Sequence, residues 1–266
     1  MSYKFNNLFS DDFGRFSGVV AVNKPIGITS HDAVDVLRRE FKTKQVGHAG
    51  ALDPFASGVL VLLVGKATKY SELFLNSDKD YLATVLFGRA TNSADPEGQV
   101  LQDIDTASLD LAKLQSELEI IKPQFMPDYR QFVPVYSSIK VGGEKLRVLA
   151  RSSDRFELIT TEGNRIAKFY KGDQVIEVQV PAHDCKITKM DFQSAEYITF
   201  ADKSYASVVV DVACSKGTYI RSLAEDIGLA LPTALPAMLS NLCRTRVADI
   251  HLVDCVELDN VRSLIS

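Results

Sequence analysis

The sequence predicts an α+β protein in which helices flank a mixed, mainly antiparallel sheet. Strand-like and helix-like segments are interspersed, without the regular strand–helix–strand rhythm of a parallel sheet. The second half of the chain consists mostly of strand patterns around one helix at 217–228. A length of 266 residues, 46% of them hydrophobic, is ample for a sizeable core without disulfides or a structural metal.

The first elements follow from apolar runs and capping residues. Residues 18–25 form a buried strand that ends at Pro25, and Thr29 or Ser30 then caps a helix. Asp32 lies in the first turn of that helix, where a carboxylate suits the helix dipole. The apolar residues of the helix fall on one face: Ala33, Val34, Leu37 and Phe41.

The following segments alternate between irregular and regular backbone. Residues 46–58 are rich in glycine and irregular, whereas 59–64 form a continuous apolar strand. Further patterns predict short helices at 67–76 and near 144–151, a longer helix at 111–121, and strands at about 79–88, 174–180, 185–200 and 205–213.

The composition excludes several classes of protein. The apolar content excludes a disordered chain, and the run 59–64 is far too short to span a bilayer. The start of the chain is polar and acidic, so it does not resemble a signal peptide. We therefore expect a soluble protein of the cytoplasm.

Cysteine and histidine are few and scattered. The four cysteines contain no C-x-x-C pair, and the four histidines lie far apart in the sequence. We expect buried, inert thiols and no metal site.

Charge is distributed unevenly along the chain, although the net charge is only −4. Residues 95–121 contain seven acids and one lysine, a net charge of −6, whereas 122–155 contain seven bases and three acids, a net charge of +4. The run 37–44 carries four bases and one acid. Solvated faces would explain each run alone, but the basic runs also suit RNA or another phosphate-bearing partner.

The stretch Gly47-His48-Ala49-Gly50-Ala51-Leu52-Asp53-Pro54 is the most informative for chemistry. Its glycines permit tight or left-handed backbone, and Pro54 biases Asp53 toward an extended conformation. A carboxylate held rigidly among apolar neighbours suits a nucleophile or a general base. On composition alone, an aspartate that only caps a turn remains the more common case.

A second candidate is the stretch 214–221, at a strand-to-helix junction. Its glycine and amide groups could bind an anion, and Arg221 could hold a carboxylate with both arms of its guanidinium. Taken alone, Arg221 could equally be a surface base, and Tyr81 in its strand could be a core residue. The segment GKATK at 65–69 does not match a P-loop, and G-x-S-x-G does not occur, so neither nucleotide hydrolysis nor a serine elbow is supported.

Five strings occur in a specific order: VNKPIGITSHDAV, VGHAGALDPFASGVLVLLVGKATK, DKDYLATVLFGRATNSADPEG, VYSSIKVGGEKLRVLAR and CSKGTYIRSLAEDIG. Together they resemble the TruB-type tRNA pseudouridine synthases, which isomerise uridine 55 in the T loop of tRNA. The resemblance runs from about 18 to 258. It implies the pseudouridine synthase fold and a reaction that needs no cofactor and no metal.

The resemblance also implies roles for individual residues. Asp53 matches the catalytic aspartate of the family, Arg221 matches the arginine that pairs with it, and Tyr81 matches the tyrosine that stacks on the target base. These three groups suit the chemistry. The target base must leave its stack in the RNA, and the ring of Tyr81 can stack on it instead. Burial would favour the neutral form of the Asp53 carboxylate, and the positive charge of Arg221 opposes that effect.

The resemblance implies roles for four further residues in binding the substrate. Tyr219 and Leu242 match residues beside the nucleotide, His48 matches a histidine near the distorted T loop, and Lys24 matches a lysine that supports the pocket. The string before Tyr136 departs from the family, since Val133 and Val135 flank a single Pro134 where two prolines are usual.

The resemblance implies one catalytic domain at 18–266, preceded by an extension at 1–17. Within that domain we expect a basic, thumb-like excursion at about 122–155, mobile without RNA and closing over the T loop. It should turn its bases toward RNA while the acids of 95–121 face solvent. The candidate phosphate contacts are Arg130, Lys140, Lys145, Arg147 and Arg151.

The expected partner is the T arm of tRNA. Many relatives continue into a small C-terminal RNA-binding domain, for which the chain has no room before Ser266. A guide-RNA-dependent enzyme of the dyskerin type, which usually carries that domain, and a non-catalytic tRNA-binding or tRNA-folding protein are the alternatives. We expect a monomer that needs no membrane and no protein partner.

Overall fold

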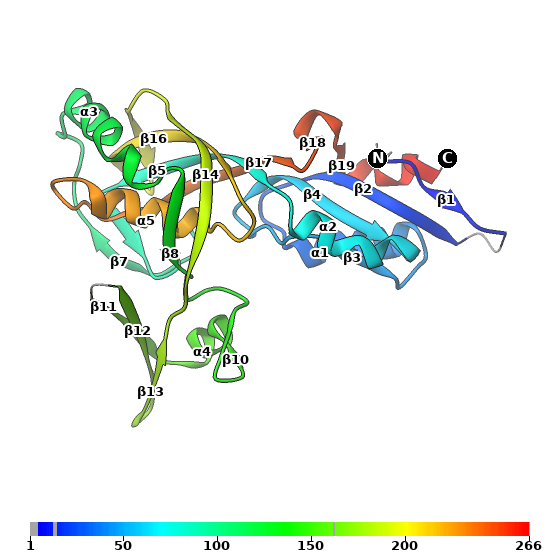
Figure 1. Ribbon diagram of the computed structural model, residues 1–266, viewed down its shortest axis with the longest axis horizontal. Helices are drawn as coiled ribbons and strands as arrows, with labels where there is room; N and C mark the ends of the chain where they lie inside the picture. Colours follow the sequence, from blue (N-terminus) through cyan, green and yellow to red (C-terminus); the bar gives the residue numbers. More distant parts are fainter. Residues whose placement is uncertain (1–4, 13–14, 162, 266) are drawn as a thin grey trace.

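The computed structural model describes residues 5–12, 15–161 and 163–265, which form an elongated body with a smaller unit projecting from it (Figure 1). Within these residues, twelve strands form one sheet: β1 (Phe9–Ser10), β2 (Phe16–Lys24), β3 (Val46–His48), β4 (Ser57–Val64), β5 (Lys79–Phe87), β8 (Asp128–Phe132), β14 (Ala182–Phe192), β15 (Glu196–Phe200), β16 (Lys203–Cys214), β17 (Ala237–Val247), β18 (Ile250–His251) and β19 (Val256–Glu257).

The remaining elements are shorter. The other strands are β6 (Arg89–Thr91), β7 (Val100–Asp103), β9 (Lys140–Val141), β10 (Glu144–Lys145), β11 (Arg155–Thr161), β12 (Asn164–Lys171) and β13 (Gln174–Gln179). The α-helices are α1 (Ser30–Glu40), α2 (Ser71–Leu75), α3 (Leu111–Ile121), α4 (Leu146–Ser152) and α5 (Ile220–Ala230). The 3-10 helices are η1 (Gly65–Tyr70), η2 (Lys122–Gln124), η3 (Leu252–Asp254) and η4 (Leu258–Ile265).

The large sheet is mixed and mainly antiparallel, as the sequence predicts. Its strand order is β1-β2-β4-β17-β5-β16-β14-β8, and β17 runs parallel to β4 but antiparallel to β5. Strand β4 is buried along almost its whole length, because apolar clusters cover both of its faces. This explains the continuous apolar run at 59–64.

The main core lies between the sheet and its helices. In β5 the alternate residues Tyr81, Ala83, Val85 and Phe87 are buried on one face, and α5 packs against β5, β8 and β17. At the other end of the body, Thr29 caps α1 in a capping box with Asp32. Helix α1 therefore begins at the predicted cap, whereas α5 begins at Ile220, three positions after the predicted start at 217.

The projecting unit differs in its bounds from the predicted excursion at 122–155. The segment 128–132 is β8, an edge strand of the large sheet paired with β14, so the first part of the excursion belongs to the body. The projecting unit extends further along the chain, through the hairpin β9–β10, helix α4 and the sheet β11–β12–β13 (Figure 1). Its own apolar cluster contains Val135, Leu146 and Phe169. We call residues 133–180 the thumb.

Three other segments depart from the predicted pattern. The predicted strand 185–200 is two strands, β14 and β15, and the predicted extension contributes Phe16 and Ser17 to β2. Strand β17 lies at the centre of the sheet although its sequence is not visibly periodic. Register shifts after Leu239 and Arg244 interrupt its alternation, which hides it from a pattern of period two.

Gly58 is required by the close approach of β4 and β17. It has a φ of +105°, and a Cβ there would lie 2.2 Å from the carbonyl oxygen of Arg244. Gly143 has a similar φ of +91°, but nothing lies within 4 Å of the corresponding Cβ position. A substitution at Gly143 therefore carries the cost of the left-handed backbone without a steric clash.

We expect Gly58→Ala to lower the free energy of unfolding by well over the roughly 1 kcal/mol that a strained backbone alone costs. Gly143→Ala should cost only that smaller amount. Urea denaturation of the two variants measures the difference, and equal losses would contradict the proposed steric contact.

Candidate functional site

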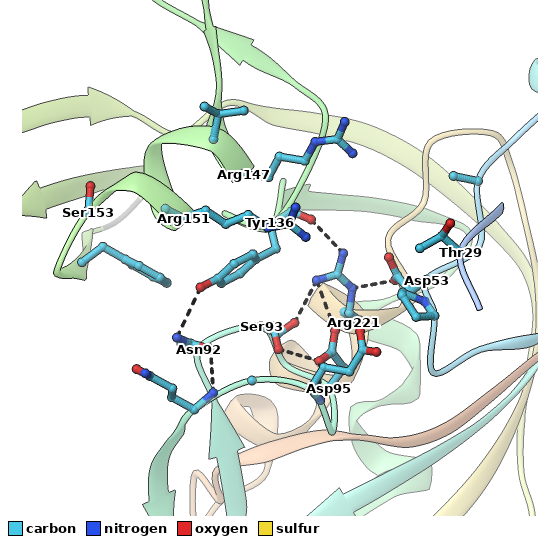
Figure 2. Close-up of a pocket in the computed structure, with 18 of the residues that line it drawn as sticks. Thr29, Asp53, Asn92, Ser93, Asp95, Tyr136, Arg147, Arg151, Ser153 and Arg221 are labelled. Atoms are coloured by element: carbon cyan, nitrogen blue, oxygen red, sulfur yellow. Dashed lines mark hydrogen bonds and ion pairs between the residues drawn. The ribbon is translucent and has the colours of Figure 1, made fainter. Parts of the chain in front are cut away.

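A pocket of about 960 Å³ lies between the body and the thumb. The body contributes Asp53, Asp95 and Arg221 to its lining, and the thumb contributes Tyr136 and Arg151 (Figure 2). Residues that are more than 160 positions apart in the chain therefore meet in one cavity, which is large enough for a nucleotide.

Asp53 lies on the loop between β3 and β4, and the backbone of this loop is fixed on both sides of it. The Ser30 hydroxyl accepts a hydrogen bond from the Leu52 amide at 2.8 Å and donates to the Leu52 carbonyl at 3.1 Å. After Asp53, the Pro54 carbonyl accepts a hydrogen bond from the Gly27 amide at 2.8 Å. The Asp53 side chain remains 39% exposed, which leaves it open to a ligand in the pocket.

Arg221 lies in the first turn of α5, and its side chain is only 6% exposed. Its Nε is 3.0 Å from Oδ2 of Asp53, and its Nη1 is 3.6 Å from Oδ2 of Asp95. The same guanidinium donates to the carbonyl oxygens of Ser93 at 2.9 Å and Tyr136 at 3.0 Å (Figure 2). Arg221 thus joins two carboxylates of the body to the thumb.

Asp95 was not predicted as a site residue, and its position corrects the expectation that the acids of 95–121 face solvent. It is buried, and burial raises its pKa while a hydrogen bond from Ser93 and the charge of Arg221 lower it. Ser93 donates to Oδ1 of Asp95 at 2.5 Å, and the Glu97 amide donates to the same oxygen at 3.0 Å. The turn-forming string NSADPEG was the available signal, since Asp before Pro in such a string often binds backbone amides.

Tyr81 and Leu242 lie in the core beneath the site. Tyr81 is 7% exposed, and Leu242 is 5% exposed. Among the described residues neither belongs to the pocket lining. Burial raises the pKa of Tyr81, and the positive charge of Arg244 opposes that shift.

Lys24 and His48 border the loop that carries Asp53. The ammonium of Lys24 is fully buried and donates to the carbonyls of Pro25 and Ile28, each at 2.8 Å, and it lies 3.5 Å from the Pro54 carbonyl. Burial lowers the pKa of Lys24 to about 8. His48 lines the pocket, and burial followed by the charge of Arg244 lowers its pKa.

Tyr219 immediately precedes α5 and lies where the body meets the thumb. Its amide donates to Oε1 of Gln131 at 2.6 Å, and its ring packs against the apolar cluster of the thumb. Burial raises its pKa. Tyr219 is not part of the pocket lining in the described structure.

The five predicted phosphate contacts divide into three groups. Arg147 and Arg151 line the pocket from α4, and neither forms an ion pair with a carboxylate of the described residues. Lys140 and Lys145 lie on the β9–β10 hairpin, away from that lining. Arg130 lies on β8 in the body and pairs with Asp184 at 2.9 Å.

The described residues contain no group of three or more His, Cys, Asp or Glu side chains that could hold a metal ion. The four cysteines are free; Cys185 and Cys214 are buried, and Cys243 and Cys255 are partly buried. In the part of the chain that the structure describes, no helix has the length and apolar character needed to cross a membrane.

Residues 38–169 match the family model described as the N-terminal domain of the TruB family pseudouridylate synthases. A protein of Staphylococcus saprophyticus named tRNA pseudouridine synthase B is 33% identical over 94% of this chain and 72% of the relative. A protein of Mycobacteroides abscessus with the same name is 38% identical over 89% of this chain and 69% of the relative. The chain belongs to the TruB family. The string around Asp53 lies within the matched residues, and the string around Arg221, which meets it in the pocket, lies beyond them.

Solved structures agree with this membership at the level of the fold. A chain of an H/ACA ribonucleoprotein bound to a substrate RNA containing 2′-deoxyuridine has a TM-score of 0.57 at 21% identity. A chain of an archaeal box H/ACA complex has a TM-score of 0.54 at 20% identity. This TruB-family chain covers 52% of each of those chains, about half of their length.

Arg221→Lys keeps the charge but loses the planar guanidinium. A lysine ammonium cannot take the place of the separate nitrogens that reach Asp53, Asp95 and the carbonyls of Ser93 and Tyr136. We expect the rate of pseudouridine formation to fall roughly 10- to 100-fold, the equivalent of one lost charge-assisted hydrogen bond in the transition state. Pseudouridine mapping in a tRNA transcript measures it. Arg246→Lys is the matched control, because Arg246 also pairs with a carboxylate, Asp80, but lies outside the pocket lining.

Proposed function

We propose that this chain is a tRNA pseudouridine synthase that isomerises uridine 55 in the T loop of tRNA. The observation that carries the proposal is the pairing of Asp53 with Arg221 at the base of an open pocket. Membership of the TruB family and relatives named tRNA pseudouridine synthase B support tRNA as the substrate.

The reaction requires a carboxylate and no redox change. The bond between N1 of uracil and C1′ of ribose breaks, the base turns, and C5 bonds to C1′. N1 then carries a proton, and the proton of C5 passes to solvent, so the product has the same composition as the substrate. Asp53 is the proposed catalytic group, because its carboxylate is open to the pocket yet paired with a buried cation.

The other predicted residues are proposed to hold the base and the loop. Tyr81 is proposed to stack on uracil, with Leu242 and Tyr219 completing the wall around the flipped nucleotide. His48 is proposed to contact the T loop, and the burial of Lys24 beside the Pro54 carbonyl supports a role in holding the loop of Asp53.

We further propose that the protein acts as a monomer, without guide RNA or a protein partner, in the cytoplasm where tRNA is found. The relatives with 33–38% identity are named as tRNA-modifying enzymes, which favours this reading over a guide-RNA-dependent one. The thumb is proposed to be the RNA-facing unit, because Arg147 and Arg151 point their charge at the pocket without a carboxylate partner among the described residues.

Asp53→Asn keeps the shape of the side chain but removes its charge. We expect pseudouridine formation to fall by roughly 10²-fold or more, since the group acts in the chemical step, while tRNA affinity is retained. Purified protein and an unmodified tRNA transcript, without guide RNA, suffice for the measurement. Asp80→Asn is the control, because Asp80 is also paired with an arginine but lies away from the pocket. Substantial turnover by Asp53→Asn would remove Asp53 from the mechanism.

Arg147→Gln combined with Arg151→Gln tests the thumb. Each lost phosphate contact should reduce the slope of log affinity against log salt by roughly 0.7 to 0.9. Affinity is measured at several salt concentrations for full tRNA and for an isolated T-arm hairpin. Arg262→Gln is the control, since Arg262 is an exposed base on η4, outside the thumb and the pocket lining. If the double variant keeps the slope of the wild type, the thumb is not the surface that holds RNA.

A further inference from the structure

Arg244 lies in the centre of the protein, yet it belongs to none of the strings by which the sequence resembles its family. It stands on β17 and is 2% exposed, among the largest fully enclosed side chains of the described structure. No carboxylate of the described residues lies within ion-pair distance of it. A buried cation without an anion is costly, so its retention calls for a specific set of hydrogen-bond acceptors.

Those acceptors are backbone carbonyls, and two of them belong to the loop that carries Asp53. Nε of Arg244 donates to the Val59 carbonyl at 2.8 Å, and Nη2 donates to the Gly50 carbonyl at 3.0 Å. Nη1 donates to the Ala51 carbonyl at 3.4 Å. The planar fork of one guanidinium therefore ties this loop, two residues before Asp53, to the start of β4.

The strand pairing brings Arg244 to this place. Gly58 of β4 faces the Arg244 backbone so closely that a side chain at 58 would collide with it. The other edge of β17 pairs with β5, where Arg244 stands directly opposite Tyr81. The two side chains therefore project from the same face of the sheet. The register shift directly after Arg244 is the kind of bulge that re-aims a side chain toward a site.

Arg244 also interacts with the tyrosine that is proposed to stack on the base. In the pairing of β17 with β5, Arg244 stands directly opposite Tyr81, and its positive charge opposes the burial that raises the pKa of Tyr81. Its charge adds to burial in lowering the pKa of His48 and of Lys24, the two other residues that border the loop. One buried cation thus binds the loop that carries Asp53 and acts through its charge on Tyr81, His48 and Lys24.

We propose that Arg244 is a positioning residue of the reaction, which holds the Asp53 loop by its backbone carbonyls from a strand position directly opposite Tyr81. This inference rests on the proposed function. The loop would then be held by Arg244 before Asp53, by Ser30 at Leu52, and by Lys24 and Gly27 after it. A catalytic carboxylate needs such support, because a displacement of about 1 Å can cost roughly 10²-fold in rate.

The test compares Arg244→Lys and Arg244→Met with the wild type and with Arg246→Lys and Arg246→Met. Arg246 lies two residues further along the same strand and binds Asp80 and the Ala248 carbonyl, away from the loop. Lysine at 244 keeps the charge, but its single nitrogen cannot occupy the three separate positions from which Nε, Nη1 and Nη2 reach the Val59, Ala51 and Gly50 carbonyls. The measurements are single-turnover pseudouridine formation in a tRNA transcript, tRNA affinity, and thermal melting of each variant.

We expect Arg244→Lys to form pseudouridine about 10-fold or more slowly, with tRNA affinity within about twofold of the wild type, and Arg244→Met to lose about 10²-fold. The Arg246 variants should lose melting temperature but little rate. Should Arg244→Met fail to fold, Arg244→Lys decides the question.

Each result has one meaning. If wild-type protein is active and Arg244→Lys reacts at the wild-type rate, the inference is overturned and the proposed function stands. The inference is also overturned if the rate loss in Arg244→Lys is matched by Arg246→Lys, or if it is accompanied by an equal loss of tRNA affinity. If wild-type protein forms no pseudouridine in tRNA, the proposed function fails, and this inference fails with it.

Discussion

The ion pair between Arg221 and Asp53 is the interaction on which the arrangement of the site depends. A guanidinium that is 6% exposed is stable only where anions and carbonyls surround it, and here it has two carboxylates and two carbonyl oxygens. Satisfying it requires the loop of Asp53, the turn of Asp95 and the start of α5 to meet. The pocket is formed where these three segments converge.

The same guanidinium links chemistry to RNA binding. One of its hydrogen bonds goes to the Tyr136 carbonyl, near the start of the thumb, so the position of the thumb and the position of the paired carboxylate are coupled. Tyr136 lines the pocket on the side opposite Asp53, together with Arg147 and Arg151 (Figure 2). A thumb that moves on binding RNA would therefore act directly on the hydrogen bonds that hold Arg221.

Buried cations are a recurrent device in this protein. Lys24, Lys79, Arg221 and Arg244 are each at most 7% exposed, and all four donate to backbone carbonyls. Lys24 and Arg244 bind the loop around Asp53, whereas Lys79 donates to the carbonyls of Phe74 and Leu75 at the end of α2. Irregular backbone next to a pocket cannot satisfy its carbonyls within a helix or sheet, and these cations supply the missing donors.

The sequence by itself determined the elements whose signals are local. The capping box at Thr29, the apolar stripe of α3, the alternation of β5 and the continuous run of β4 each depend on neighbours a few residues away. The motif strings also identified Asp53 and Arg221 as partners. Only the tertiary structure decided the bounds of the thumb, the central place of β17 and the roles open to Asp95 and Arg244. Those features depend on strand pairing and on contacts between residues more than 100 positions apart, and a buried arginine has the same local sequence signal as an exposed one.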